Sequence, residues 1–128
     1  MNSTHLSHRV RFLPWKGTRY ETGFRGARTL ILGESNYQKD GKRFSRRLNI
    51  ELIGGQADGI GRYTGSWPYW TKIITLLSPE DPDRHQFWHS VAYYNFIQEF
   101  TGAVARKRPT SQMWLDARKP FFEILSAG

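Results

Sequence analysis

Cysteine is absent from this sequence of 128 residues. Its absence excludes a disulfide framework, a thiol nucleophile, a cysteine-based zinc site and a cysteine-ligated iron–sulfur cluster. No run of about 18 consecutive apolar residues occurs either, so the sequence predicts no transmembrane helix. Residues 1–12 lack the apolar core that a secretory signal needs, and we therefore expect a cytoplasmic protein.

Metal ligands and phosphate-binding loops are also scarce. The sequence has 4 histidines, of which His85 and His89 would share one face of a short helix. That spacing suits a metal pair, but no third ligand follows at a zinc-binding spacing, so we favour a histidine pair without a metal. The sequence has neither a Walker-type loop nor a dinucleotide-binding fingerprint, and we expect no cofactor.

Positive charge and aromatic rings are abundant. Lys and Arg number 19 against 11 Asp and Glu, which gives a formal net charge of +8, and aromatic residues make up 15% of the chain. Most of the excess charge lies in the first half, with its densest stretch between Lys39 and Arg47. Cations that alternate with rings suit single-stranded or flipped-base nucleic acid, because cations bind phosphate and rings stack on bases. The alternative is a solvated basic surface that aids solubility.

Two short apolar runs predict the core strands. Arg28–Leu32 and Val91–Ile97 are nearly all apolar, as in parallel strands that are buried on both faces. An extended arm around Pro14, with Val10, Phe12 and Trp15, is expected to pack on the domain. We expect helices within Ser45–Ile53, over Ser66–Leu77 with Ser66 as N-cap, over Arg84–His89 after an Asp83 cap, and over Gln112–Leu125 with a Thr110 or Ser111 cap and a break at Pro120. The glycine-rich segment 54–65 is interpreted as a long loop.

This order of elements predicts an α/β fold with a parallel sheet. We expect residues 1–128 to form a single α/β domain, or the N-terminal part of one, with a loose tail at residues 1–8. A sheet with only two clear strands leaves an edge exposed, which favours a homo-oligomer that covers it.

The ligand site of a parallel sheet lies beyond the carboxyl ends of its strands. That rule selects the residues after the first strand and those at the end of the second. Glu34 could position a water molecule or accept a hydrogen bond from a base, Tyr37 could stack on a planar ligand, and Asn95 matches a pyrimidine edge. The alternative is an ordinary strand-to-loop turn in which Asn95 satisfies a backbone group.

Two motifs carry a family resemblance. Leu30–Tyr37 (LILGESNY) resembles the first motif of the uracil-DNA glycosylase superfamily, whose branches have G-Q-D-P-Y or G-E-A-P-G after the first core strand. Tyr93–Phe96 (YYNF), followed by Arg106–Thr110 (RKRPT), is similar to the strand with the uracil-reading Asn and the segment after it. The resemblance implies a parallel-sheet three-layer sandwich that holds a flipped base in a pocket.

The resemblance also implies roles for individual residues. Asn95 would bind the pyrimidine edge, Tyr37 would lie beside C5 of the base, and Glu34 would polarise water or hold the base. Phe44 is a candidate stacking ring that no motif fixes. Ser35 stands where one branch has its water-activating Asp, and a serine cannot serve as that base at neutral pH.

The family's later strands and its His-Pro-Ser motif are not found after residues 112–125. We therefore expect the front portion of the fold, with Glu34 and Ser35 as catalytic candidates and with weak or no activity. Asn36 replaces the motif proline, and the lack of cysteine excludes the iron–sulfur cluster of some branches.

Three functions stay open at this point. The first is a uracil-DNA glycosylase-like protein that hydrolyses an N-glycosidic bond in its complete form. The second is a non-catalytic nucleic-acid-binding module, with DNA favoured over RNA. Its phosphate-binding candidates are Lys42, Arg43, Arg46, Arg47, Arg106, Lys107 and Arg108. The third is a binder of nucleotides or other small ligands.

Overall fold

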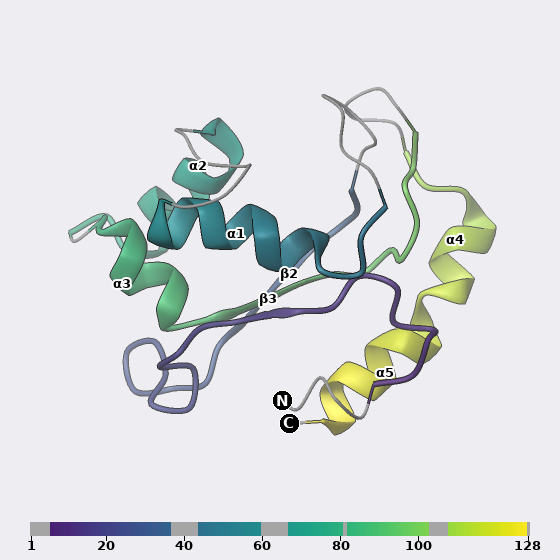
Figure 1. Ribbon diagram of the computed structural model, residues 1–128, viewed down its shortest axis with the longest axis horizontal. Coiled ribbons are helices and arrows are strands. Elements are labelled where there is room, and N and C mark those ends of the chain that lie inside the picture. The colour runs from purple at the N-terminus through teal and green to yellow at the C-terminus, as the bar shows by residue number, and fades with distance from the viewer. Residues whose placement is uncertain (1–5, 37–43, 60–66, 81, 103–107, 128) are drawn as a thin grey trace. The chain divides into compact units, whose positions relative to one another are not determined.

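The computed structural model describes residues 6–36, 44–59, 67–80, 82–102 and 108–127. Its elements in chain order are β1 (Trp15–Lys16), β2 (Leu30–Gly33), α1 (Leu48–Asp58), α2 (Pro68–Leu77), α3 (Arg84–His89), β3 (Ala92–Asn95), α4 (Ser111–Asp116) and α5 (Arg118–Ser126) (Figure 1). The fold is mixed α/β, as the sequence predicts. The chain divides into two compact units. Unit 1 contains Met1–Pro14, Leu32–Leu48 and Tyr94–Gly128, and unit 2 contains Trp15–Ile31 and Asn49–Tyr93.

The described strands form a sheet in the order β1-β3-β2. The β2–β3 pair is parallel, because the Ala92 amide donates to the Thr29 carbonyl and, four residues later on each strand, the Phe96 amide donates to the Gly33 carbonyl. The β1–β3 pair is antiparallel, with Trp15 opposite Tyr93. The prediction of a purely parallel sheet is therefore wrong at β1, because the expected extended arm joins the sheet as a strand.

The two predicted core strands differ in burial. All four residues of β3 are buried, as the apolar run predicts. The expectation that the first run is buried on both faces is wrong, since Leu32 in β2 is 49% exposed. The reason is position, because β2 stands at the end of the order of described strands while β3 has a neighbour on each side.

Capping residues place the shorter helices where the sequence predicts them. The Asp83 side chain accepts a hydrogen bond of 2.9 Å from the Gln86 amide and begins α3. Helix α2 begins at Pro68 with Trp67 in the N-cap position, and the predicted Ser66 cap lies outside the described residues. Within the described residues, no helix is both long enough and apolar enough to cross a membrane.

Helix α1 corrects the prediction of a long loop after Ile53. It begins at Leu48 and continues through Gly54 and Gly55 to Asp58. Glycine has a low helix propensity, but tertiary packing overrides it here. A Cβ atom built on Gly54 would lie 3.9 Å from the Trp15 ring, so the helix approaches this ring closely.

The C-terminal helices of unit 1 hold the beginning of the chain. Thr110 caps α4 by accepting a hydrogen bond from the Met113 amide, as predicted. The break falls at Ala117 and not at Pro120, because Pro120 lies in the first turn of α5, where no amide hydrogen is needed. Ser7, which the sequence placed in a loose tail, donates two hydrogen bonds of 3.0 and 2.7 Å to the Glu123 carboxylate.

Candidate functional site

The carboxyl ends of β2 and β3 lie side by side in unit 1. The Ile97 amide donates to the Glu34 carbonyl at 2.8 Å, and Asn36 forms a parallel bridge with Phe100. The Thr101 amide then donates to the Asn36 carbonyl at 3.1 Å. The two segments that the sequence selected from their place after the strands are therefore neighbours.

Buried polar groups gather at this strand end. Among the described residues, neither the Ser35 hydroxyl nor the Asn36 amide nitrogen has a hydrogen-bond partner, and both atoms are buried. Asn36 is 5% exposed and Asn95 is 3% exposed. A buried polar group without a partner costs about 1–3 kcal/mol of stability. The strand end therefore carries hydrogen-bonding capacity that the described residues do not use.

Glu34 and Arg108 form an ion pair at this end of the sheet. The Arg108 guanidinium donates to the Glu34 carboxylate at 2.9 Å, and the two side chains are 73% and 33% exposed, respectively. An exposed pair of this kind contributes about 0–1 kcal/mol. The sequence predicted a catalytic role for the Glu34 carboxylate and a phosphate-binding role for Arg108. The structure places the two side chains in contact with each other.

The remaining predicted site residues are scattered or outside the described part of the chain. Tyr37, Lys42, Arg43, Arg106 and Lys107 lie outside the described residues. Arg47 is exposed on the surface of unit 1.

Phe44 and Arg46 both contact the N-terminal arm of unit 1. Phe44 is 48% exposed, meets the Phe12 ring edge-on, and has the Arg11 guanidinium 4.5 Å from its ring centre. Arg46 donates to three main-chain carbonyls of the arm, at Leu6, Ser7 and Val10. Its guanidinium therefore holds the arm in place.

The structure adds a basic groove that the sequence analysis missed. This groove in unit 1 has a volume of about 760 Å³, and its charged lining residues are four cations, Arg9, Arg11, Arg118 and Lys119, and two carboxylates, Glu99 and Asp116. The arm alternates exposed and buried residues, with Arg9 and Arg11 exposed and Val10 and Phe12 buried. Arg9 lies in a turn, in which the Val10 amide donates to the Ser7 carbonyl at 3.1 Å. The alternation of cationic and apolar residues over 9–12 was the signal that could have joined these arginines into one surface.

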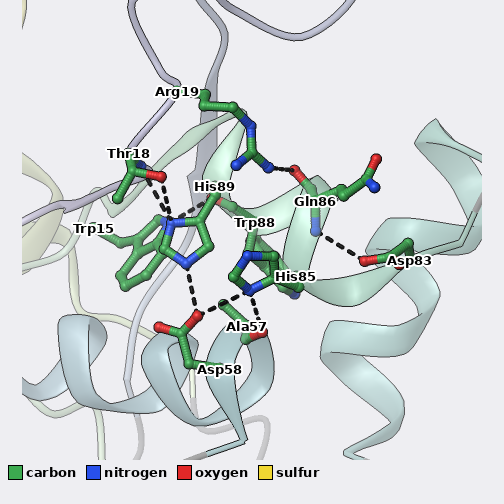
Figure 2. A network of polar contacts seen from close by, with 10 residues as sticks. All are labelled: Trp15, Thr18, Arg19, Ala57, Asp58, Asp83, His85, Gln86, Trp88 and His89. Atoms are coloured by element: carbon green, nitrogen blue, oxygen red, sulfur yellow. Dashed lines mark hydrogen bonds and ion pairs between the residues drawn. The ribbon is translucent and has the colours of Figure 1, made fainter.

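A second cluster lies in unit 2, where Asp58 at the end of α1 meets two histidines of α3 (Figure 2). The Asp58 Oδ1 atom lies 2.8 Å from His89 Nε2 and 3.1 Å from His85 Nδ1. His89 is 7% exposed, and its Nδ1 accepts a hydrogen bond of 3.2 Å from the Thr18 amide. The hydrogen bond from His89, together with the charges and hydrogen bonds of both imidazoles, lowers the pKa of Asp58 below its ordinary value.

Close backbone packing fixes the position of His89. A Cβ atom on Gly17 would lie 2.3 Å from the His89 carbonyl, so only glycine fits there. The Arg19 amide donates to the same carbonyl at 2.7 Å. The histidine pair could be predicted from its spacing, whereas Asp58 was missed because the glycine-rich segment 54–65 predicted a loop at this end of α1.

No protein-family model matches this sequence, and neither the curated proteins nor the solved structures contain a significant match. The functional interpretation therefore depends on the chain's own residues.

Proposed function

We propose that this chain binds nucleic acid and receives a pyrimidine base at the carboxyl ends of β2 and β3. One observation carries the proposal, namely the two buried polar atoms of Ser35 and Asn36 that have no partner within the described residues. Both follow directly on β2 and lie next to the segment that follows Asn95. A ligand with its own donors and acceptors would satisfy them.

A pyrimidine base has the complementary groups. A hydroxyl both donates and accepts, an amide nitrogen donates, and the edge of uracil offers carbonyl oxygens and a ring N–H. The resemblance of Leu30–Tyr37 and Tyr93–Phe96 to the uracil-DNA glycosylase motifs supports a pyrimidine over a purine. The proposal includes the three-layer sandwich that this resemblance implies, and a base that leaves the stack to enter the pocket.

The cations of unit 1 would bind the phosphates. The Glu34–Arg108 pair is weak enough for Arg108 to exchange the carboxylate for a phosphate, because an exposed pair contributes little. The groove lined by Arg9, Arg11, Arg118 and Lys119 offers a further path for the backbone. Glu34 would then be released toward the base, where it could position a water molecule for N-glycosidic hydrolysis. We expect weak or no base release, because Ser35 cannot act as a base.

Fluorescence anisotropy with single-stranded DNA that contains one uracil tests the proposal. We expect tighter binding than to the same strand with an abasic site, and a logarithmic salt slope of about −0.7 for each phosphate contact. Replacing both Arg118 and Lys119 with Gln should make the slope shallower by about 1.4. Arg28→Gln, which removes a single positive charge in unit 2, should leave the slope unchanged.

Four outcomes separate the alternatives. Equal affinity for the uracil and abasic strands would exclude the base pocket, and binding without salt dependence would favour a small-ligand binder. Uracil release that Glu34→Gln abolishes would establish a glycosylase. Binding with no release would leave a non-catalytic nucleic-acid-binding module.

A further inference from the structure

We infer that Asp58, His85 and His89 form a binding site for a divalent transition metal of the zinc type, separate from the proposed base pocket. Each residue offers one ligand atom, and the three atoms lie within 4.8 Å of one another. Ligands around a tetrahedral zinc ion lie at about 2.0–2.1 Å from it, and therefore about 3.3 Å from each other. Two of the three separations, 2.8 and 3.1 Å, are already close to that value.

Secondary structure brings the three ligands together. His85 and His89 are four residues apart on α3, so both rings project from one face, and their centres are 4.7 Å apart. Asp58 reaches them from the last position of α1. Figure 2 shows both imidazoles directed toward the Asp58 carboxylate. Two imidazoles and one carboxylate form a donor set that zinc and iron(II) use in proteins.

His89 is the preorganised ligand. Its ring is buried and packs against the Trp15 ring with centres 5.3 Å apart. The Trp15 indole N–H donates to the Trp88 carbonyl at 2.8 Å, which fixes the chain just before His89. A ligand whose position is fixed by its surroundings loses little conformational entropy when it binds a metal. The exposed side chain of His85 can move the short distance that coordination needs.

The hydrogen bonds of His89 show which ring nitrogen must lose its proton when a metal binds. The Thr18 amide donates to His89 Nδ1, so in the free protein the proton sits on Nε2, which donates to Asp58. A metal on Nε2 requires the proton on Nδ1. The Thr18 hydroxyl oxygen, 3.2 Å from Nδ1, can accept it. Metal binding therefore shifts the His89 tautomer and breaks the hydrogen bond from the Thr18 amide, and the Thr18 hydroxyl becomes the outer partner that orients the ring.

The same argument holds for His85. Its Nδ1 faces two acceptors, the Asp58 carboxylate and the Ala57 carbonyl at 3.3 Å, so it carries the proton in the free protein. Three protein ligands leave a fourth position of a tetrahedral ion for water. The side chains of His85 and Asp58 are 60% and 31% exposed, so solvent can reach that position. The site is thus of the open type and not a closed structural zinc site.

Calorimetric titration of the chelator-treated 128-residue chain with zinc ions alone tests the inference. We expect saturable binding of one zinc ion per chain. His85→Gln and Asp58→Asn should each weaken it more than about 100-fold, and Thr18→Val about 10-fold. His8→Gln, at an exposed histidine of unit 1, should leave the affinity unchanged. Titration with cobalt(II) should give the intense visible absorption of a tetrahedral ion.

Long-range ¹H–¹⁵N spectra of the histidine rings test the wild-type chain without a substitution. Zinc should move the ring proton of His89 from Nε2 to Nδ1 and that of His85 from Nδ1 to Nε2. Absence of saturable binding, unchanged tautomers, or equal affinity in His85→Gln would overturn the inference. The cluster would then be a hydrogen-bonded network only.

Discussion

Ser35→Ala should stabilise the free protein and weaken its binding to the base. The Ser35 hydroxyl is buried without a partner in the described part of unit 1. Its desolvation therefore lowers the stability of the fold, and no hydrogen bond among the described residues offsets that cost. Alanine keeps the Cβ atom and removes only the hydroxyl.

The magnitude follows from the cost of an unpaired group. Removing the hydroxyl should raise the free energy of unfolding by about 1 kcal/mol and by at most about 3 kcal/mol. Loss of one hydrogen bond to a bound base should weaken binding about fivefold, which corresponds to about 1 kcal/mol. Ser90→Ala is the matched control, because the Ser90 hydroxyl donates to the Phe87 carbonyl at 2.7 Å. The same substitution there should lower the free energy of unfolding by about 1 kcal/mol.

Urea denaturation measures the stability change, and anisotropy with the uracil and abasic strands measures the binding change. The reasoning requires opposite signs of the stability change at Ser35 and Ser90. If Ser35→Ala destabilises the chain as much as Ser90→Ala does, the hydroxyl has a partner within the fold. If it stabilises the chain but leaves the preference for uracil over the abasic site unchanged, the group does not face the base.

Two further predictions concern the packing of two glycines and the pH dependence of the Ser7–Glu123 contact. Gly17→Ala should destabilise unit 2 by about 1–3 kcal/mol, because the added Cβ would overlap the His89 carbonyl. Gly54→Ala should instead stabilise helix α1 by about 0.5–1 kcal/mol, because alanine has the higher helix propensity and its Cβ has room. Thermal unfolding measures both changes, and a change of the same sign in both variants would refute the packing argument. The hydroxyl and amide of Ser7 lower the pKa of Glu123 below its ordinary value of 4.5, so their contact stabilises the fold above that pH and is lost as the pH falls through the lowered pKa. The protection of the Ser7 amide from exchange, measured relative to an unstructured amide at the same pH, should fall in acid in the wild type and should not depend on pH in Glu123→Gln. The same acid response in both would contradict this assignment.

Local signals predicted the features that short segments determine. Asp83 caps α3 through its own neighbour Gln86, and Thr110 caps α4 in the same way, so both starts could be predicted from a few residues. The apolar run of β3 predicted its burial because the strand lies between two others. The juxtaposition of Glu34 with the end of β3 followed from the general rule for parallel strands.

Contacts between distant segments decided the features that the sequence did not predict. The antiparallel pairing of β1 requires the arm to meet a strand more than seventy residues later, and nothing near Trp15 specifies that partner. Helix α1 continues through two glycines, which their low helix propensity does not predict. Asp58 joins the histidines only because α1 continues past those glycines.

The net charge shows most clearly how folding changes a prediction from composition. A charge of +8 favours a polyanion partner wherever the cations lie, and their densest stretch in the sequence lies between Lys39 and Arg47. The Arg46 guanidinium instead donates hydrogen bonds to three carbonyls of the arm, and Arg108 forms an ion pair with Glu34. By holding the arm, Arg46 also holds Arg9 and Arg11, which line the basic groove. In the proposed function the contribution of Arg46 is therefore positional, because it fixes cations that would meet a phosphate.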